Sequence, residues 1–274
     1  MRLRVSIVVA AAFAVALAGC GKSSSGGGTP APSGGQRAAD VVARASTVTQ
    51  SAGSARTVLD VAVTGVARPT TVHGEGAFDF RHSRGTLDLQ VAGLPQGSIT
   101  MVVDGTVIYE KVPALAGASG KPWIKLDLSK AAAGAGGTDL FGSNDPTRSF
   151  AYLKGISNLT EVGPATVRGA ATREYRGTID LAKVADQLPA DSRAAYRKGL
   201  AQLGSTTAPA QIWVDDQGRL RKLKLSLQAQ VNGQQATTVL TTEYYDFGAP
   251  VQVTIPPADQ VNEVSPGVPG ATTP

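Results

Sequence analysis

The sequence predicts an α+β fold in which a long antiparallel β-sheet curls and a few helices cover its buried face. Hydrophobic and polar residues alternate along most of the central region, which is typical of strands that bury one face and expose the other. The pairs Asp104-Gly105 and Asn232-Gly233 are typical of tight turns between antiparallel neighbours. Because neighbouring strands twist relative to one another, so long a sheet is expected to curl, and helices must cover its buried face.

Helical spacing is confined to a few segments. The first runs from Ala38 to Ala52, where apolar residues recur at intervals of three and four and Gly53 ends the pattern. Asp180 is a suitable N-cap for a later helix, which Pro189 interrupts. The remaining helical segments are expected at about residues 145–156 and around Tyr196, Leu200 and Leu203, ahead of Gly204.

Period-two alternation predicts the strands. In the longest example, Leu223, Leu225 and Leu227 face one side while Lys222 and Lys224 face the other. A loop of small residues is expected at 131–138. We expect strands at residues 55–65, 87–91, 99–104, 124–128, 160–167, 173–180, 210–214, 220–231 and 236–247.

The chain begins with a segment that has the layout of an export signal. Arg2 and Arg4 precede an apolar run at residues 5–18, which is too short to cross a membrane because a span needs about 20 helical residues. The four residues LAGC, ending at Cys20, resemble the lipobox of bacterial lipoproteins, in which the cysteine is acylated and becomes the first mature residue. This resemblance implies a signal peptide at residues 1–19 and a lipid anchor at Cys20.

The rest of the chain divides by composition. Residues 20–36 are expected to form a flexible linker, because nearly all of them are Gly, Ser, Pro, Ala or Thr. Residues 37–263, about 225 in number, are enough for one large domain. Residues 264–274 are expected to form a disordered tail. With acyl chains of Cys20 inserted in membrane lipid, the protein is expected to be anchored on the outer face of the cytoplasmic membrane, in the cell envelope.

Composition excludes several classes of function. Cys20 is the only cysteine, so its acylation leaves none for a disulfide, a structural zinc site or a thiol nucleophile. The net charge of +5 falls to +3 when Arg2 and Arg4 are removed with the signal, and aromatic residues make up only 5% of the chain. A nucleic-acid partner is therefore not expected.

No catalytic or metal-binding constellation stands out. His73 and Glu75 lie two apart on one strand face, but two ligands are too few for zinc, and an exposed strand pair is the favoured interpretation. We interpret His82 as part of a polar turn. Residues 117–122 match neither a nucleophile elbow nor a phosphate loop. We expect no catalytic residue, metal or cofactor, although two carboxylates could still meet in space as in a glycosidase.

A basic cluster is the other polar feature. Arg219, Arg221, Lys222 and Lys224 follow a predicted hairpin turn. Two interpretations remain open, contact with anionic lipid headgroups or a solvated strand face, and the second is favoured.

Taken together, the segments are similar to those of a known family. A lipobox at Cys20, a linker, a helix from Ala38 and the segments REYRGTIDL (173–181) and IWVDDQGRL (212–220) resemble the actinobacterial LppX/LprG lipoproteins. The resemblance implies a LolA-like half-barrel, a curved sheet around helices with an apolar cavity that can shelter acyl chains. It also implies a lipid or glycolipid cargo and a membrane transporter as a further partner.

The resulting hypothesis is a non-enzymatic lipoprotein that carries a lipid or other long apolar molecule in the half-barrel. One alternative is an interaction module whose curved sheet docks a peptide or membrane protein, as in LolA-like envelope-stress regulators. Another is an envelope hydrolase. By alternation, the candidate lining residues are Leu59, Val61, Leu87, Leu89, Val91, Ile99, Met101, Val103, Leu223, Leu225 and Leu227.

Overall fold

The computed structural model describes only part of the chain. The described residues are 34–93, 98–111, 120–127, 148–186, 193, 196–197, 200, 205–231 and 234–263. The chain divides into two units, Met1–Ala31 and Pro32–Pro274, and all of the described residues belong to the second. Several sequence expectations lie outside the described residues: the signal, Cys20, the linker up to residue 33, residues 117–119 and 131–138, Leu203, Gly204, the Asn232-Gly233 turn and residues 264–274.

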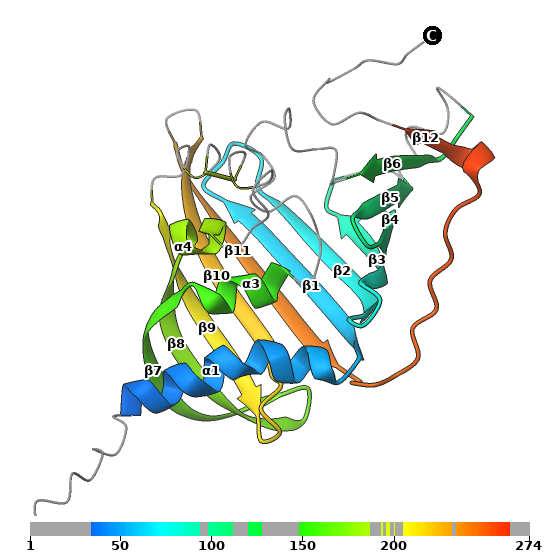
Figure 1. The fold of residues 1–274 in the computed structure, drawn as a ribbon. Coiled ribbons are helices and arrows are strands. Elements are labelled where there is room, and N and C mark those ends of the chain that lie inside the picture. Colours follow the sequence, from blue (N-terminus) through cyan, green and yellow to red (C-terminus); the bar gives the residue numbers. More distant parts are fainter. Residues whose placement is uncertain are drawn as a thin grey trace, which may run out of the picture. The chain divides into compact units, whose positions relative to one another are not determined.

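A 12-stranded sheet forms the body of the second unit (Figure 1). Its strands match the expected segments closely, including the strand expected around His73 and Glu75, and β5 and β12 add to them. The strands are β1 (Ser54–Thr64), β2 (Thr70–Asp79), β3 (Arg84–Val91), β4 (Ser98–Asp104), β5 (Val107–Lys111), β6 (Trp123–Asp127), β7 (Ile156–Val167), β8 (Ala170–Asp180), β9 (Thr207–Asp215), β10 (Leu220–Val231), β11 (Gln234–Tyr245) and β12 (Val261–Glu263).

The strand order shows how the sheet is assembled. It reads β12-β6-β5-β4-β3-β2-β1-β11-β10-β9-β8-β7, so two meanders meet where β1 pairs with β11. All pairs are antiparallel except β12 with β6, which is parallel. The expected antiparallel sheet is confirmed, and the parallel strand β12 is an addition at its edge, reached by a long connection after β11 and not by a hairpin.

The helices lie on one side of the sheet, which we call the inner face; the opposite side is the outer face (Figure 1). Those with described bounds are α1 (Gly34–Ser51), α3 (Arg148–Lys154) and α4 (Leu181–Asp186); residues 193, 196–197 and 200 are also helical, and a short 3-10 turn, η3 (Ala258–Gln260), precedes β12. Helix α1 begins four residues before the expected Ala38. The sequence pattern missed this first turn because Gly35, Gln36 and Arg37 are exposed and none of them is apolar. The expected α+β fold class is confirmed.

One buried hydrogen bond fixes α1 against the sheet. Ala38, Val42 and Ala45 of α1 are fully buried in the core. The backbone N–H of Leu220, at the start of β10, donates to the Thr49 hydroxyl at 2.8 Å, and that hydroxyl donates to the Ala45 carbonyl at 2.6 Å. Because both partners are buried, the bond sets where the end of α1 meets the strand.

Two glycines allow the sheet to curl between β2 and β3. A Cβ atom at Gly76 would overlap the carbonyl oxygen of Thr86 and approach the Leu87 Cα to 2.9 Å. At Gly74, a Cβ would lie 2.6 Å from the Leu89 Cδ2 atom. Backbone and side chains of β3 thus occupy the space over β2 that side chains would otherwise fill.

An ion-pair cluster closes the turn between β9 and β10. The Asp215 carboxylate accepts hydrogen bonds from the Arg219 backbone N–H and side chain, and from the Arg221 side chain at 2.7 Å. Both guanidinium groups also lie over the Phe247 ring. Burial alone would raise the pKa of Asp215, but the bonds from Arg219 and Arg221 outweigh it and hold that pKa below its usual value.

The curl at Gly76 can be tested by adding one methyl group. We expect Gly76→Ala to lower the free energy of unfolding by about 2 to 4 kcal/mol, because the backbone of β3 cannot move aside without breaking the β2–β3 ladder. Gly35→Ala is the control, since a Cβ there meets only the Leu159 carbonyl oxygen at 3.5 Å. Urea unfolding of both variants measures the difference; equal stability would contradict the close approach.

The Asp215 cluster predicts an acid-dependent stability. Its side chain is only 5% exposed, so Asp215→Asn should lower the free energy of unfolding near neutral pH by about 2 to 3 kcal/mol. Since folding lowers the pKa of Asp215, its contribution is present above about 3.8 and is lost as the pH falls through the folded-state pKa.

The exposed neighbour provides the control for this charge change. Asp216→Asn should leave stability nearly unchanged, because Asp216 is exposed. Urea unfolding at several pH values should show the wild type and Asp215→Asn converging in acid. A gap between them that stays constant down to the lowest pH would contradict the assigned role.

Candidate functional site

All of the candidate lining residues lie on the inner face of the sheet. The register aligns Leu223 of β10 with Thr242 of β11, which faces Leu59 of β1. The same row continues through Gly74 of β2 to Leu89 of β3 and Ile99 of β4. Each remaining candidate lies an even number of residues along its own strand from a member of this row. The alternation in the sequence therefore correctly predicts that they share one face of the sheet.

The inner face carries two hydrophobic clusters that differ in what covers them. The first, which we call the helix-covered cluster, combines strands β7–β11 and Ala55 of β1 with helical residues, for example Val42, Leu153 and Val184. The second, which we call the strand cluster, contains only strand residues and the adjoining Phe80 among those described. Its buried members are Leu59, Phe78, Leu87, Leu89, Met101, Val103 and Ile108.

The candidates divide between these clusters. Leu223, Leu225 and Leu227 belong to the helix-covered cluster, where helices already pack against them. Five others belong to the strand cluster, and two more, Val61 and Ile99, are partly buried beside it. Val91 is half-buried and belongs to neither. The structure therefore places the candidates in two environments that sequence alternation cannot distinguish.

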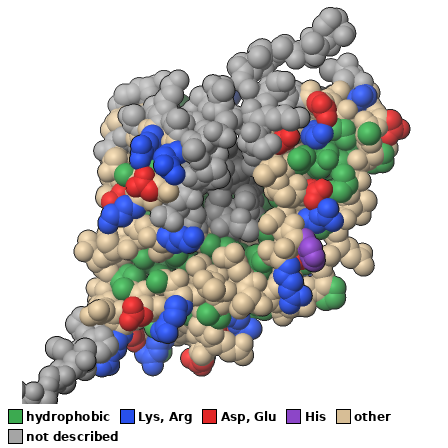
Figure 2. Space-filling view, viewed as in Figure 1, with side chains coloured by type: hydrophobic (Ala, Val, Ile, Leu, Met, Phe, Trp, Pro, Cys, Tyr) green, Lys and Arg blue, Asp and Glu red, His purple; other side chains and the backbone are tan. Residues whose placement is uncertain are grey.

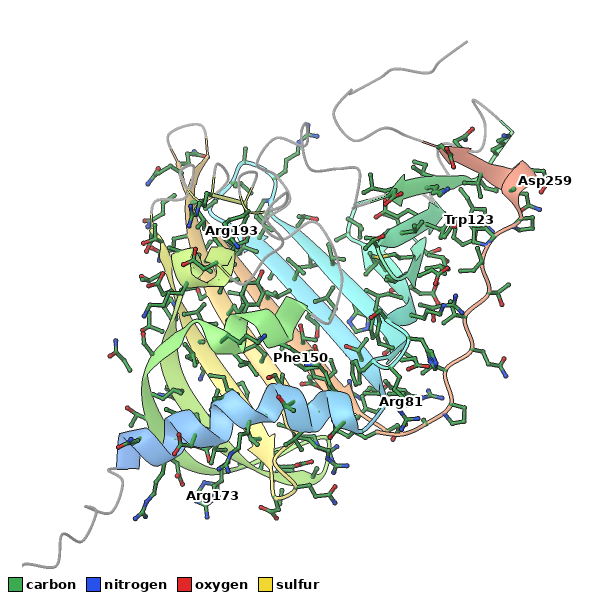
Figure 3. The ribbon with its side chains drawn as sticks, viewed as in Figure 1. Arg81, Trp123, Phe150, Arg173, Arg193 and Asp259 are labelled. Atoms are coloured by element: carbon green, nitrogen blue, oxygen red, sulfur yellow. The ribbon has the colours of Figure 1, made fainter. Side chains whose placement is uncertain are left out.

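Aromatic rings mark the boundary between the two clusters. Phe150 extends from α3 toward the sheet and stacks on Tyr244 of β11, with ring centroids 5.5 Å apart (Figure 3). Phe80 contacts Phe150 edge-on at 5.5 Å and Phe78 at 5.7 Å. Phe80 packs against both clusters. These rings separate the helix-covered half of the inner face from the half formed by β1–β5.

Exposure increases toward one end of the strand cluster. A row of four aliphatic residues crosses β11, β1, β2 and β3 there, namely Leu240, Val61, Val72 and Val91. All four are half-buried, whereas Leu59, Leu87 and Met101 deeper on the face are buried. We call this row the rim. Toward the β12 edge of the sheet, Ile124 and Leu126 of β6 are also half-buried. Figure 2 shows hydrophobic side chains at the surface in this region.

Sequence reasoning missed the glycines of β2 as part of this surface. Gly74 and Gly76 lie on the inner face, and their lack of side chains lets Leu87 and Leu89 lie across β2. The signal was present as two glycines alternating within an expected strand, which indicates close approach of another segment.

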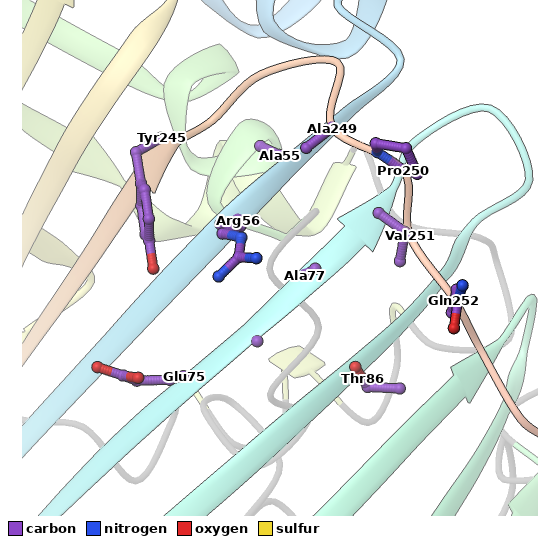
Figure 4. Close-up of a pocket in the computed structure, with 11 residues that line it drawn as sticks. Ala55, Arg56, Glu75, Ala77, Thr86, Tyr245, Ala249, Pro250, Val251 and Gln252 are labelled. Carbon is purple, nitrogen blue, oxygen red and sulfur yellow. The ribbon is translucent and has the colours of Figure 1, made fainter.

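A pocket of about 260 Å³ lies beside the outer face (Figure 4). Its walls are Arg56, Glu75 and Thr86 of the sheet, Tyr245, and the extended residues 249–252 that follow β11. Arg56 forms an exposed ion pair with Asp246 at 3.6 Å. None of the candidate lining residues borders this pocket, so it is distinct from the inner face.

The polar residues singled out in the sequence form pairs on the outer face or in turns. His73 Nδ1 lies 2.7 Å from Asp60, and its Nε2 lies 3.5 Å from Glu75. The hydrogen bond with Asp60 is the main cause of a raised pKa of His73. His82 pairs with Asp79 within the turn after β2. The favoured interpretation of His73 and Glu75 as an exposed strand pair is confirmed.

The basic cluster is largely neutralised. Arg219 and Arg221 bind Asp215, and Lys222 binds Glu243 at 2.9 Å. Burial favours a raised pKa at Glu243, but the bonds from Lys222 and Arg168 outweigh it and lower that pKa. Because these cations already have carboxylate partners, the cluster favours the strand-face interpretation over headgroup contact.

Two further features concern metals and membranes. Among residues 34–263 with the stated gaps, no group of three or more His, Cys, Asp and Glu side chains could hold a metal ion. Within the same part of the chain, every helix is too short or too polar to cross a membrane.

Comparison with known proteins gives relatives of both sequence and structure. No family model matches the chain. It is 30% identical over 151 residues to an uncharacterized 31.2 kDa protein in the rplA–rplJ intergenic region of Streptomyces griseus. That alignment covers 52% of this chain and 48% of the relative, so the chain spans about half the length of the curated relative it matches.

Solved structures extend the comparison to most of the chain. LppX of Mycobacterium tuberculosis superimposes with a TM-score of 0.50 at 16% identity, over 80% of this chain and 98% of LppX. LprF from Mycobacterium bovis gives a TM-score of 0.48 at 16% identity, over 80% and 97% of the two chains. The expected likeness to LppX/LprG-type lipoproteins is confirmed in the fold: the chain has the open, curved-sheet architecture of LppX.

Proposed function

We propose that the protein binds a lipid or another long apolar molecule on the inner face of β1–β5. The observation that carries this proposal is the strand cluster, whose described members come from the sheet without a helix among them. In the other half of the same face, helices α1, α3 and α4 supply the covering side chains. An acyl chain would take the place in the strand cluster that helices take in the helix-covered cluster.

The chemistry of the surface suits a hydrocarbon chain. Leu59, Leu87, Leu89 and Met101 offer aliphatic groups and no charge, and Met101 is fully buried among them. Transfer of one methylene group out of water contributes about 0.8 kcal/mol, so about ten methylenes would contribute on the order of 8 kcal/mol before ordering costs. Binding of this kind requires no polar catalyst and no metal.

The rim is the proposed entry point for such an acyl chain. Val61, Val72 and Val91 are half-buried and lie one row above the buried aliphatic residues. A ligand that entered between them would exchange partial contact with water for contact with Leu59 and Leu89. The proposal therefore places the end of the ligand at the rim and its chain along β1–β4.

The anchor completes the proposal. Acylation of Cys20 and a linker ahead of α1 would hold the domain beside membrane lipid, on the outer face of the cytoplasmic membrane. Cargo then needs only a short transfer between bilayer and sheet. LppX, which shares the fold, is a lipoprotein. A lipid or glycolipid cargo and a transporter partner fit this location.

We also propose that the protein is not an enzyme. The Asp215 carboxylate is engaged by two arginines, and the Glu243 carboxylate by Lys222 and Arg168. His73 is held by Asp60 on the exposed outer face. Groups fixed in such pairs stabilise the strands they join, and none of them borders the strand cluster.

Docking of a peptide along the edge at β7 receives less support. This edge strand has two register irregularities, and it contains Pro164, which has no backbone N–H to donate. Bulges and proline are the devices that protect an edge from strand addition. The interaction module therefore remains the second hypothesis.

Purified domain, residues 37–263, should carry lipid. We expect mass spectrometry of its organic extract to detect an acylated molecule, and the emptied domain to take up a fluorescent fatty acid. Repeated absence of both signals from folded protein would refute the proposal.

A partial block of the strand cluster should weaken this uptake. Ile99→Trp fills space beside Leu89 at a position that is only partly buried, so the fold should tolerate it. We expect affinity for the fluorescent fatty acid to fall at least five-fold, about 1 kcal/mol. Val162→Trp, at a site 48% exposed on β7, is the matched control and should bind as the wild type does. Equal affinity of the two variants would exclude this surface.

A further inference from the structure

One hydroxyl on the inner face lacks a hydrogen-bond partner. Thr57 of β1 is 2% exposed, and its Oγ1 atom forms no hydrogen bond within the part of the chain that the structure describes. Along β1 it lies between Ala55 and Leu59, and across the sheet it faces Gly76 and Tyr244. Its position is therefore at the boundary between the helix-covered cluster and the strand cluster.

A buried hydroxyl without a partner needs an explanation. Burial removes water from the donor and acceptor sites of the hydroxyl, and this loss is normally offset by a bond within the protein. Valine has nearly the same shape and would avoid that cost in an aliphatic environment. Threonine at this position is consistent with a hydrogen bond formed only when another molecule is bound.

We propose that Thr57 Oγ1 donates a hydrogen bond to an oxygen atom within the chain of the bound lipid. This inference rests on the proposed function and specifies the class of ligand: a fatty chain that carries a hydroxyl or carbonyl oxygen along its length. A plain hydrocarbon chain would leave the Thr57 hydroxyl as unsatisfied as it is in the free protein.

The depth of Thr57 locates that oxygen along the chain. Val61 at the rim is four residues away on the same strand, which corresponds to about 13 Å at roughly 3.3 Å per residue. Leu59 lies between them on the same face. A chain that runs from the rim along β1 therefore reaches Thr57 near its middle, far from the headgroup.

A second buried hydroxyl without a hydrogen bond, that of Thr172, provides the matched control. Thr172 of β8 is 4% exposed, and its Oγ1 atom also lacks a hydrogen bond. It faces Asp215 of β9 and lies on the opposite side of β8 from the buried Tyr175. Thr172→Val makes the same chemical change as Thr57→Val, outside the strand cluster.

The test compares octadecanoate with hydroxyoctadecanoates whose hydroxyl occupies successive positions in the middle of the chain. Each competes with the fluorescent fatty acid for the wild type, Thr57→Val, Thr57→Ser and Thr172→Val. We expect the wild type to prefer at least one mid-chain isomer over octadecanoate by about five-fold. Thr57→Val should lose that preference while it still binds octadecanoate, whereas Thr57→Ser and Thr172→Val should keep it.

The outcomes separate this inference from the proposed function. If octadecanoate itself fails to displace the probe from the wild type, the proposed function fails. If octadecanoate binds but no isomer is preferred, or if Thr57→Val keeps the preference, the role of Thr57 is refuted. Thermal unfolding of Thr57→Val, expected to match or exceed the wild type, excludes misfolding as the cause of a lost preference.

Discussion

The two halves of the inner face differ in what packs against them: described helices contribute to the helix-covered cluster, and none contributes to the strand cluster. Residues of α1, α3 and α4 pack over β7–β11, and the described part of β1–β5 forms a cluster of its own. The bond from Leu220 to Thr49 keeps α1 over its half. In the proposed complex, an acyl chain packs against the strand cluster as the helices pack against the other half, and its burial supplies the favourable free energy of binding.

The curl of the sheet makes this arrangement geometrically feasible. Gly74 and Gly76 let β3 approach β2 closely, so the side chains of β3 and β4 turn toward those of β1. The aromatic rings of Phe80, Phe150 and Tyr244 then close the side toward the helices. The Asp215 cluster and the Lys222–Glu243 pair support strands from the outer face and leave the inner face apolar.

Sequence reasoning predicts local features here better than long-range ones. Alternation identifies strands such as β10 and the shared face of Leu59 and Leu223, because side-chain direction depends only on neighbouring residues. It cannot reveal that Arg56 pairs with Tyr245, since this contact depends on how two meanders meet. The split of the candidates into two halves follows from that pairing. The parallel β12 and the unsatisfied Thr57 hydroxyl likewise depend on tertiary arrangement.

The central claim, that ligand occupies only the half of the inner face without described helices, can be tested by methyl NMR during a fatty-acid titration. We expect the methyl signals of Leu87, Leu89 and Met101 to shift with saturation, while those of Leu223 and Leu225 stay in place because α-helices already fill their surroundings. Equal shifts in both groups would contradict the account. So would a titration in which neither group responds.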